Sequence, residues 1–224
     1  MNMLRFLLTT IVVAAPLAAI SQEAEFVFAR SNRSIAVIHT DAGRQGSAVA
    51  YLEFEDGTGF LTNCHVLKDA TAFTVSRNGK RAPGTLLAGR PEDDLCMVDA
   101  PLRLPAVDTR NFFTLRVGEK LYAIGAPNGL ELSISEGILS QLRGQLILGQ
   151  ALLVQTTTAI SPGSSGGGLF DAQGRLVGIT SFHFKESQSL NFAVATNMAN
   201  SLFSHGTVDS LDALNRFYTE KPSE

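Results

Sequence analysis

The sequence predicts an all-β protein made of antiparallel strands, arranged as barrels or as a sandwich. Short segments rich in Val, Ile, Phe and Thr recur along the chain, and Gly, Asp, Asn or Pro bound most of them. Short strands at regular spacing, divided by turn signals, are typical of these two architectures. The length of 224 residues and the ordinary composition, 45% hydrophobic and 17% charged, allow one large domain or two small ones.

The N-terminal segment has the features of a secretory signal peptide. One Arg precedes an apolar run over residues 6–20, which contains a proline and is shorter than the roughly 20 residues of a spanning helix. Small residues at Ala19 and Ser21 fit a cleavage site before Gln22. We therefore expect residues 1–21 to be removed on export to the periplasm or out of the cell, with no stable membrane anchor left. The alternative is an uncleaved anchor.

Two series of strands are expected in the mature chain, one in an N-terminal unit over residues 22–108 and one in a C-terminal unit over residues 109–206. The strands of the first series are SIAVIHT, GSAVAYLEF, GTGFLTN, TAFTVS and DLCMVDA. Those of the second are EKLYAIGAP, LSISEGILSQL, QLILGQALLVQTT, GRLVGITSFHF and LNFAVAT. The segment PLRLPAVDTRNFF, with two prolines, is the expected linker between the units.

The C-terminal part of the chain predicts one short helix. In NMANSLFSH, helical spacing places Met198, Leu202 and Phe203 on one face. Residues 207–224 are expected to be a polar tail with a loosely held turn or helix.

Charge and metal-ligand patterns exclude several classes of function. The formal net charge is −3 and there is no basic run, so we expect no nucleic-acid partner. The sequence has two cysteines but no C-x-x-C pair, and no second His stands at ligand spacing. We expect neither a metal nor a cofactor.

A glycine-rich stretch, SPGSSGGGLF, is the first candidate for chemistry. Three consecutive glycines disfavour a helix or strand interior, because each loses much backbone entropy on ordering. A nucleophilic serine needs such a backbone, since N–H groups must point at an oxyanion and substrate must approach closely. The alternative is a glycine-rich surface turn. The loop also matches Gly-x-Ser-x-Gly, but a turn, a hairpin and a strand follow Ser165 where an α/β-hydrolase needs a helix.

A base and an orienting acid stand upstream of this loop. His65 lies at a strand end in GTGFLTNCHVLKDA, and Asp94 lies at a strand start in PEDDLCMVDA, with Asp93 as its rival. The order His65, Asp94, Ser165 is that of the chymotrypsin-like triad, which draws its His and Asp from one half of the chain and its Ser from the other.

Several motifs together resemble the Deg/HtrA branch of chymotrypsin-like serine proteases. They run in order from about residue 57 to residue 199: LTNCHVLKDA, DLCMV, VGEKLYAIGAPNGLELSISEGILSQL, QTTTAISPGSSGGGLFDAQGRLVGI and LNFAVATNMA. The resemblance implies two six-stranded antiparallel β-barrels with a short C-terminal helix, and a secreted serine endopeptidase that acts on protein or peptide substrates. It makes Ser165 the nucleophile, His65 the general base and then acid, and Asp94 the orienter of the imidazole. Gly163, Ser164 and Ser165 would form the oxyanion hole.

The sequence departs from the family pattern in two places. Ser164 stands where the family usually has Asn, and Gly168 stands where it usually has Pro. These departures leave open an alternative, a catalytically degenerate protease-fold protein that binds or scaffolds. After Ala199 only about two dozen residues remain, fewer than the ~50 of an independent domain, so we expect the protease domain alone, without a PDZ module.

The resemblance also assigns a substrate pocket and brings the two cysteines together. By resemblance, the pocket is lined by Thr158, Ile160, Thr180, Ser181, Phe182, Asn191 and Ala193. No acid stands among them, so small or medium apolar side chains are expected rather than Lys or Arg. If His65 and Asp94 meet, Cys64 and Cys96 lie close behind them, either as a disulfide or as two separate buried thiols, and the sequence does not decide between these.

Overall fold

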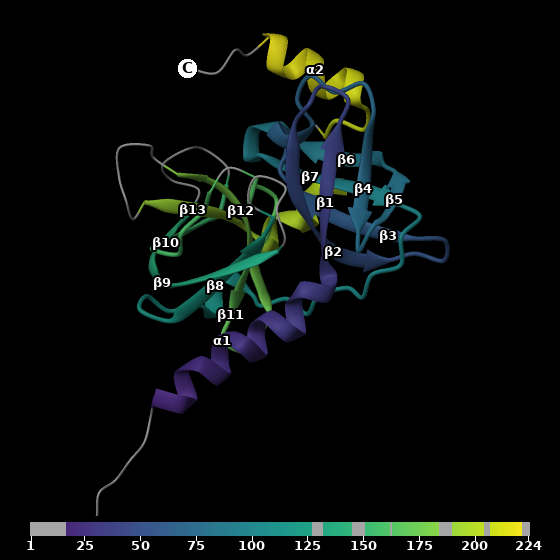
Figure 1. Ribbon diagram of the computed structural model, residues 1–224. Helices are drawn as coiled ribbons and strands as arrows, with labels where there is room; N and C mark the ends of the chain where they lie inside the picture. Colours follow the sequence, from purple (N-terminus) through teal and green to yellow (C-terminus); the bar gives the residue numbers. More distant parts are fainter. Residues whose placement is uncertain are drawn as a thin grey trace, which may run out of the picture.

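The computed structural model describes residues 17–126, 132–144, 151–161, 163–183, 190–203 and 207–220. Two β-structures lie side by side, and a helix stands at each end of the described chain (Figure 1). Residues 1–16 of the predicted signal peptide lie outside the described part of the chain. Its remaining residues, 17–21, are the first residues of helix α1. Among the described residues, no helix is long and apolar enough to cross a membrane.

The first half is a curled antiparallel sheet of seven strands in the order β5-β4-β1-β2-β3-β7-β6. Its strands are β1 (Ile35–Thr40), β2 (Gln45–Glu53), β3 (Thr58–Thr62), β4 (Phe73–Arg77), β5 (Lys80–Pro83), β6 (Thr85–Arg90) and β7 (Leu95–Ala100). This differs from the six-stranded barrel that the family resemblance implied. The added strand β5 follows a tight hairpin turn at Asn78 and Gly79, both with positive φ, which is the geometry that an Asn-Gly pair favours.

The second half is a closed six-stranded antiparallel barrel, as the family resemblance implied. Its strands are β8 (Lys120–Gly125), β9 (Ser133–Arg143), β10 (Leu153–Thr156), β11 (Gly168–Asp171), β12 (Leu176–His183) and β13 (Asn191–Ala195). The chain after β13 forms η6 (Thr196–Phe203), a 3-10 helix where an ordinary short helix was expected.

Apolar side chains form three cores, and one of them joins the two halves. Strands of the first half contribute Val49, Leu61 and Met97, and strands of the second half contribute Ile124 and Ile179. All five are fully buried or nearly so. The removal of this apolar surface from water favours contact between the halves, so residues at the ends of their strands are held against one another.

Helix α1 (Leu17–Ser31) packs beneath the second half (Figure 1). Val27 is fully buried in the shared core. The Tyr122 hydroxyl donates a hydrogen bond to Glu23 over 2.6 Å, and burial together with this bond raises the pKa of Tyr122. Arg30 forms an ion pair with Asp108 over 2.6 Å in the segment that connects the halves.

Helix α2 (Leu211–Glu220) packs on the first half, within the segment expected to be a polar tail. Leu214 is fully buried in the core of the first half. Ahead of the helix, Val208 and Gly89 exchange two backbone hydrogen bonds of 2.7 and 2.8 Å. After the second half, the chain therefore returns to the first half and packs against it through Val208 and helix α2.

Asn215 on α2 holds the chain just after residue 67. Its side-chain oxygen accepts a hydrogen bond from the Asp69 N–H over 2.8 Å, and its amide donates to the Ala70 carbonyl over 2.9 Å. Asp69 needs such support because its φ of 64° lies in the left-handed region.

Asn215→Ala is expected to lower the free energy of unfolding by about 1–3 kcal/mol, because it removes both bonds and leaves backbone groups to find water. Denaturant titration measures the loss. Arg216→Ala, on an exposed position of the same helix, is the matched control and should change little. Equal stability of the two variants would show that the two hydrogen bonds of Asn215 contribute nothing to stability.

Candidate active site

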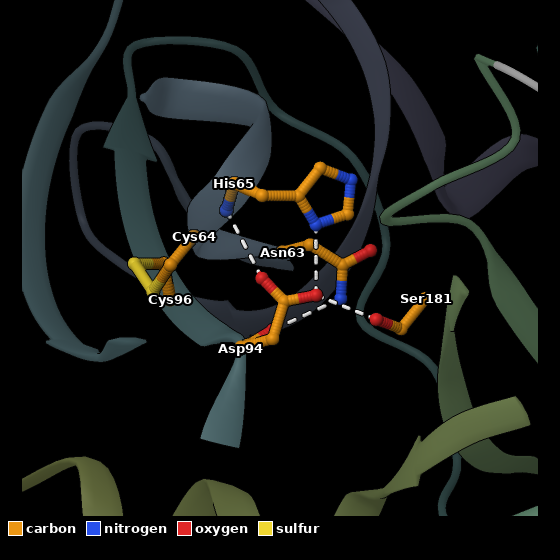
Figure 2. The surroundings of a disulfide bond; sticks show 6 residues. All are labelled: Asn63, Cys64, His65, Asp94, Cys96 and Ser181. Atoms are coloured by element: carbon orange, nitrogen blue, oxygen red, sulfur yellow. Dashed lines mark hydrogen bonds and ion pairs between the residues drawn. A yellow bond between two sulfur atoms is a disulfide. The ribbon is translucent and has the colours of Figure 1, made fainter. Parts of the chain in front are cut away.

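His65 lies on η2 (Cys64–Leu67), a 3-10 turn that begins just after strand β3. Cys64, directly before it, is joined by a disulfide to Cys96 on β7, with 5.0 Å between the two Cα atoms. Figure 2 shows this disulfide beside the segments that carry His65 and Asp94. The bond fixes the start of η2 to the neighbouring strand, so the backbone at His65 has little freedom.

Asp94 is the acid that meets His65. It caps η3 (Pro91–Asp93) in the left-handed region with φ 53°, and this conformation aims its carboxylate back at η2. Asp94 Oδ1 accepts the His65 backbone N–H over 3.0 Å, and Oδ2 lies 2.8 Å from His65 Nδ1. The rival Asp93 is 3% exposed and instead pairs with Arg90, Nε to Oδ2, over 2.6 Å.

Two further side chains hold Asp94 in place (Figure 2). The Ser181 hydroxyl on β12 donates to Asp94 Oδ2 over 2.5 Å, and the Asn63 amide donates to the Asp94 carbonyl over 2.9 Å. A carboxylate only accepts hydrogen bonds, so His65 Nδ1 carries a proton. In the neutral imidazole Nε2 then has the free lone pair, which can accept a proton.

The loop with Ser165 is fixed by backbone contacts on two sides. Ser47 on β2 donates its N–H to the Ser165 carbonyl over 2.7 Å and its hydroxyl to the Gly163 carbonyl over 3.0 Å. On the other side, the Thr180 hydroxyl on β12 donates to the Ser164 carbonyl over 2.8 Å. Gly166, with φ +84°, must be glycine, because a Cβ there would overlap the Ser47 carbonyl.

Two backbone N–H groups of this loop are suited to bind an anion. Among the residues that the structure describes, no carbonyl or side chain accepts a hydrogen bond from the N–H of Gly163 or Ser165. The Ser164 N–H is instead used within the loop, donating to the Ser161 carbonyl over 2.9 Å. Backbone N–H groups without acceptors are the kind of donors that an oxyanion hole requires.

The Ser165 hydroxyl donates to the Ser181 carbonyl over 3.2 Å. Within the described chain it makes no hydrogen bond to His65. Ser181 therefore contacts two of the candidate residues, with its carbonyl on Ser165 and its hydroxyl on Asp94. Without substrate, hydrogen bonds between catalytic groups are often absent or poorly aligned, and they form when substrate binds.

The side chains assigned to the substrate pocket lie in several places. Thr180 supports the Ser165 loop, Ser181 binds Asp94, and Ala193 is fully buried in the core of the closed barrel. The Thr158 hydroxyl pairs with that of Thr156 over 2.7 Å in a fully buried position. Ile160 and Asn191 are 8% and 5% exposed, and the side chain of Phe182 lies outside the described part.

Some residues that build the site were not singled out from the sequence. Ser47 positions the loop, and Thr62 supports Ser47 by donating its hydroxyl to the Ser47 carbonyl over 2.8 Å. Asn63 stands at the start of η2 without a side-chain capping hydrogen bond, and its amide instead donates to the Asp94 carbonyl. No sequence signal marked Ser47 or Asn215, whose contacts are 116 and 146 residues away along the chain. Among the described residues, no group of three or more His, Cys, Asp or Glu is placed to hold a metal ion.

Comparison with known proteins gives one consistent family. The profile of the "Trypsin-like peptidase domain" family matches residues 46–179. The "Serine protease Do-like HtrB" of Bacillus subtilis is 32% identical over 180 residues, which are 73% of this chain and 39% of that relative. The "Probable periplasmic serine endoprotease DegP-like" of Halomonas elongata is 34% identical over 176 residues, 74% of this chain and 37% of that relative. The chain thus spans less than half the length of these two curated relatives.

The fold agrees with a solved structure of the same kind. The structure titled "HtrA-type protease AlgW with tripeptide" superposes with a TM-score of 0.73 at 33% identity, and the match covers 83% of this chain and 65% of the other. The chain therefore belongs to the trypsin-like peptidases, in their HtrA/DegP branch.

Proposed function

We propose that the chain is an exported serine endopeptidase that hydrolyses peptide bonds through an acyl-enzyme on Ser165. The observation that carries the proposal is the pairing of His65 Nδ1 with Asp94 at 2.8 Å, while Ser165 hydrogen-bonds to Ser181, the residue that also binds Asp94. Export is supported by the apolar N-terminal segment and by the periplasmic naming of the Halomonas relative.

The proposed reaction begins when Ser165 leaves Ser181. An N–H of a substrate strand paired with β12 would take over the Ser181 carbonyl and free the Ser165 hydroxyl to turn to His65 Nε2. Ser165 Oγ then attacks the carbonyl carbon while His65 takes its proton, and the Gly163 and Ser165 N–H groups bind the oxyanion. His65 passes the proton to the leaving amine as the C–N bond breaks. Water, deprotonated by His65, then hydrolyses the ester and restores Ser165.

The proposed substrates are proteins or peptides. A solved HtrA-type relative carries a tripeptide, which supports this class. None of the residues that the family resemblance assigns to the pocket is acidic, so we propose a preference for a small or medium apolar side chain before the cleaved bond. Profiling of cleavage in a peptide library tests the preference, and a strong preference for Lys or Arg would contradict it.

Cleavage of unfolded casein by the purified protein is the direct test of the proposal. Fragments should appear and should stop appearing after treatment with a serine-directed inhibitor. A folded protein that yields no fragments under any tested condition would favour the alternative, a degenerate binding or scaffold protein.

Ser181→Ala should lower kcat by about 10- to 100-fold with little change in KM. The variant removes one charge-assisted hydrogen bond from Asp94, worth roughly 1.5–3 kcal/mol, but keeps the backbone carbonyl. Steady-state kinetics measure the split between kcat and KM. Ser201→Ala is the control, because Ser201 is a half-buried serine on η6 whose hydroxyl donates to the Met198 carbonyl. Equal kinetics of the two variants would remove Ser181 from the account.

A further inference from the structure

A hollow in the first half is lined mainly by basic and apolar residues. It measures about 590 Å³ and lies between the residues that follow α1, the β2–β3 turn, the β4–β5 hairpin and the segment after β7. Its charged members are Arg33, Arg77, Lys80, Arg103 and Asp56. Its apolar wall is made by Pro101, Leu102 and Leu104, and Asn32 and Asn78 complete it. The volume falls within the range of ligand-binding sites, ~300–1,000 Å³.

The hollow is strongly cationic in a chain that is net acidic. Four cations and one carboxylate line it, whereas the whole chain has a formal net charge of −3. In the described chain, ion pairs engage other basic residues, such as Arg44, Arg90, Arg110 and Arg175, but none of the four cations of the hollow. Of the described residues, Asp56 is the one carboxylate that lines the hollow, so the four cations leave it with an excess of positive charge.

Arg77 shows most clearly that a partner is lacking. Its side chain is half-buried, and its one described hydrogen bond is a long one of 3.4 Å to the Asn32 side chain. Burial without a facing carboxylate lowers the pKa of Arg77. A half-buried guanidinium that forms no ion pair among the described residues is free to pair with a ligand that brings negative charge.

The shape of the hollow favours a peptide over a membrane surface. A flat anionic surface would contact exposed cations such as Lys80 and Arg33 but would make little contact with Leu102 and Leu104, which are buried. A chain that carries carboxylates next to an apolar side chain can satisfy both walls. Guanidinium groups also suit carboxylates, because the two can pair through two parallel hydrogen bonds.

We propose that this hollow binds an acidic segment of a partner protein, with carboxylates on Arg33, Arg77, Lys80 and Arg103 and an apolar side chain against Leu102 and Leu104. The hollow shares no residue with the candidate active site, so the proposal does not depend on hydrolysis. A protein bound in the hollow would be held at a point away from Ser165, whether or not that protein is a substrate.

Fluorescence anisotropy with a labelled peptide of alternating Glu and Leu tests the proposal. The protein carries Ser165→Ala, so that binding is measured whether or not the chain is a protease. We expect saturable binding that weakens as salt is raised, and much weaker binding of the same peptide with Gln in place of Glu. Adding Arg77→Gln, or Lys80→Gln together with Arg103→Gln, should weaken binding by about tenfold or more. Arg116→Gln, on an exposed arginine outside the hollow, should leave it unchanged.

Three outcomes would overturn the proposal. They are equal affinity of the hollow variants and the parent, equal binding of the Gln and Glu peptides, and binding of anionic phospholipid vesicles with none of the peptide. Lys80 and Arg103 are exposed, so the double variant should fold even if Arg77→Gln does not, and thermal melting verifies this.

Discussion

Replacement of Ser165 by alanine is expected to abolish peptide-bond hydrolysis, with a loss in kcat of about 10⁶-fold. The variant removes the only atom that can form the acyl-enzyme. The loop should keep its shape, because its contacts to Ser47 and Thr180 use the backbone of residues 163–167. The measurement is single-turnover and steady-state hydrolysis of a peptide, with thermal melting to show that the fold is retained.

Controls for this prediction come from the same loop and from His65. Ser164→Ala removes a neighbouring hydroxyl and should retain most activity, since its proposed role is in the backbone. His65→Ala should cost nearly as much as Ser165→Ala, and the double variant should lose little more, because the members of a triad act as a unit. Substantial hydrolysis by Ser165→Ala would show that another residue is the nucleophile.

Replacement of both cysteines by alanine is expected to lower the free energy of unfolding by roughly 3–4 kcal/mol. The disulfide closes a loop of 32 residues, and the chain-entropy account gives a penalty of this size when such a loop is opened. Activity should fall as well, since the bond joins the strand β7 to the turn that carries His65. Denaturant titration and peptide hydrolysis at one temperature measure the two effects.

Reduction of the unaltered protein with dithiothreitol provides the matched comparison. It should reproduce the loss of stability without any change of side chain, and reoxidation should restore it. If the double variant unfolds at the same denaturant concentration as the parent, the disulfide makes no contribution to stability.

Strand patterns and the order of motifs predicted the fold class, because alternation and turn residues are local properties. The seventh strand was missed, although Asn78 and Gly79 are a local hairpin signal, because the family resemblance suggested six strands. Docking of α2 could not be read from the sequence. It depends on Leu214 entering a core made by strands more than a hundred residues earlier.

For the candidate site, the sequence predicted the residues better than the hydrogen bonds that join them. The order of His65, Asp94 and the glycine loop, together with the family resemblance, predicted these residues, and the structure places His65 beside Asp94. Sequence reasoning gave Ser181 a place in the substrate pocket but did not predict that its hydroxyl binds Asp94 or that its carbonyl accepts from Ser165. A serine's partner depends on which strands meet in space, and one sequence does not contain that information.

Labelling of the mature protein with a fluorophosphonate, followed by mass mapping of the modified residue, tests the central claim most directly. The account predicts a single label on Ser165, none on Ser165→Ala, and much slower labelling of His65→Ala, because the probe reacts with a serine whose proton is taken by a base. A folded protein that stays unlabelled, or a label that maps to another residue, would contradict it.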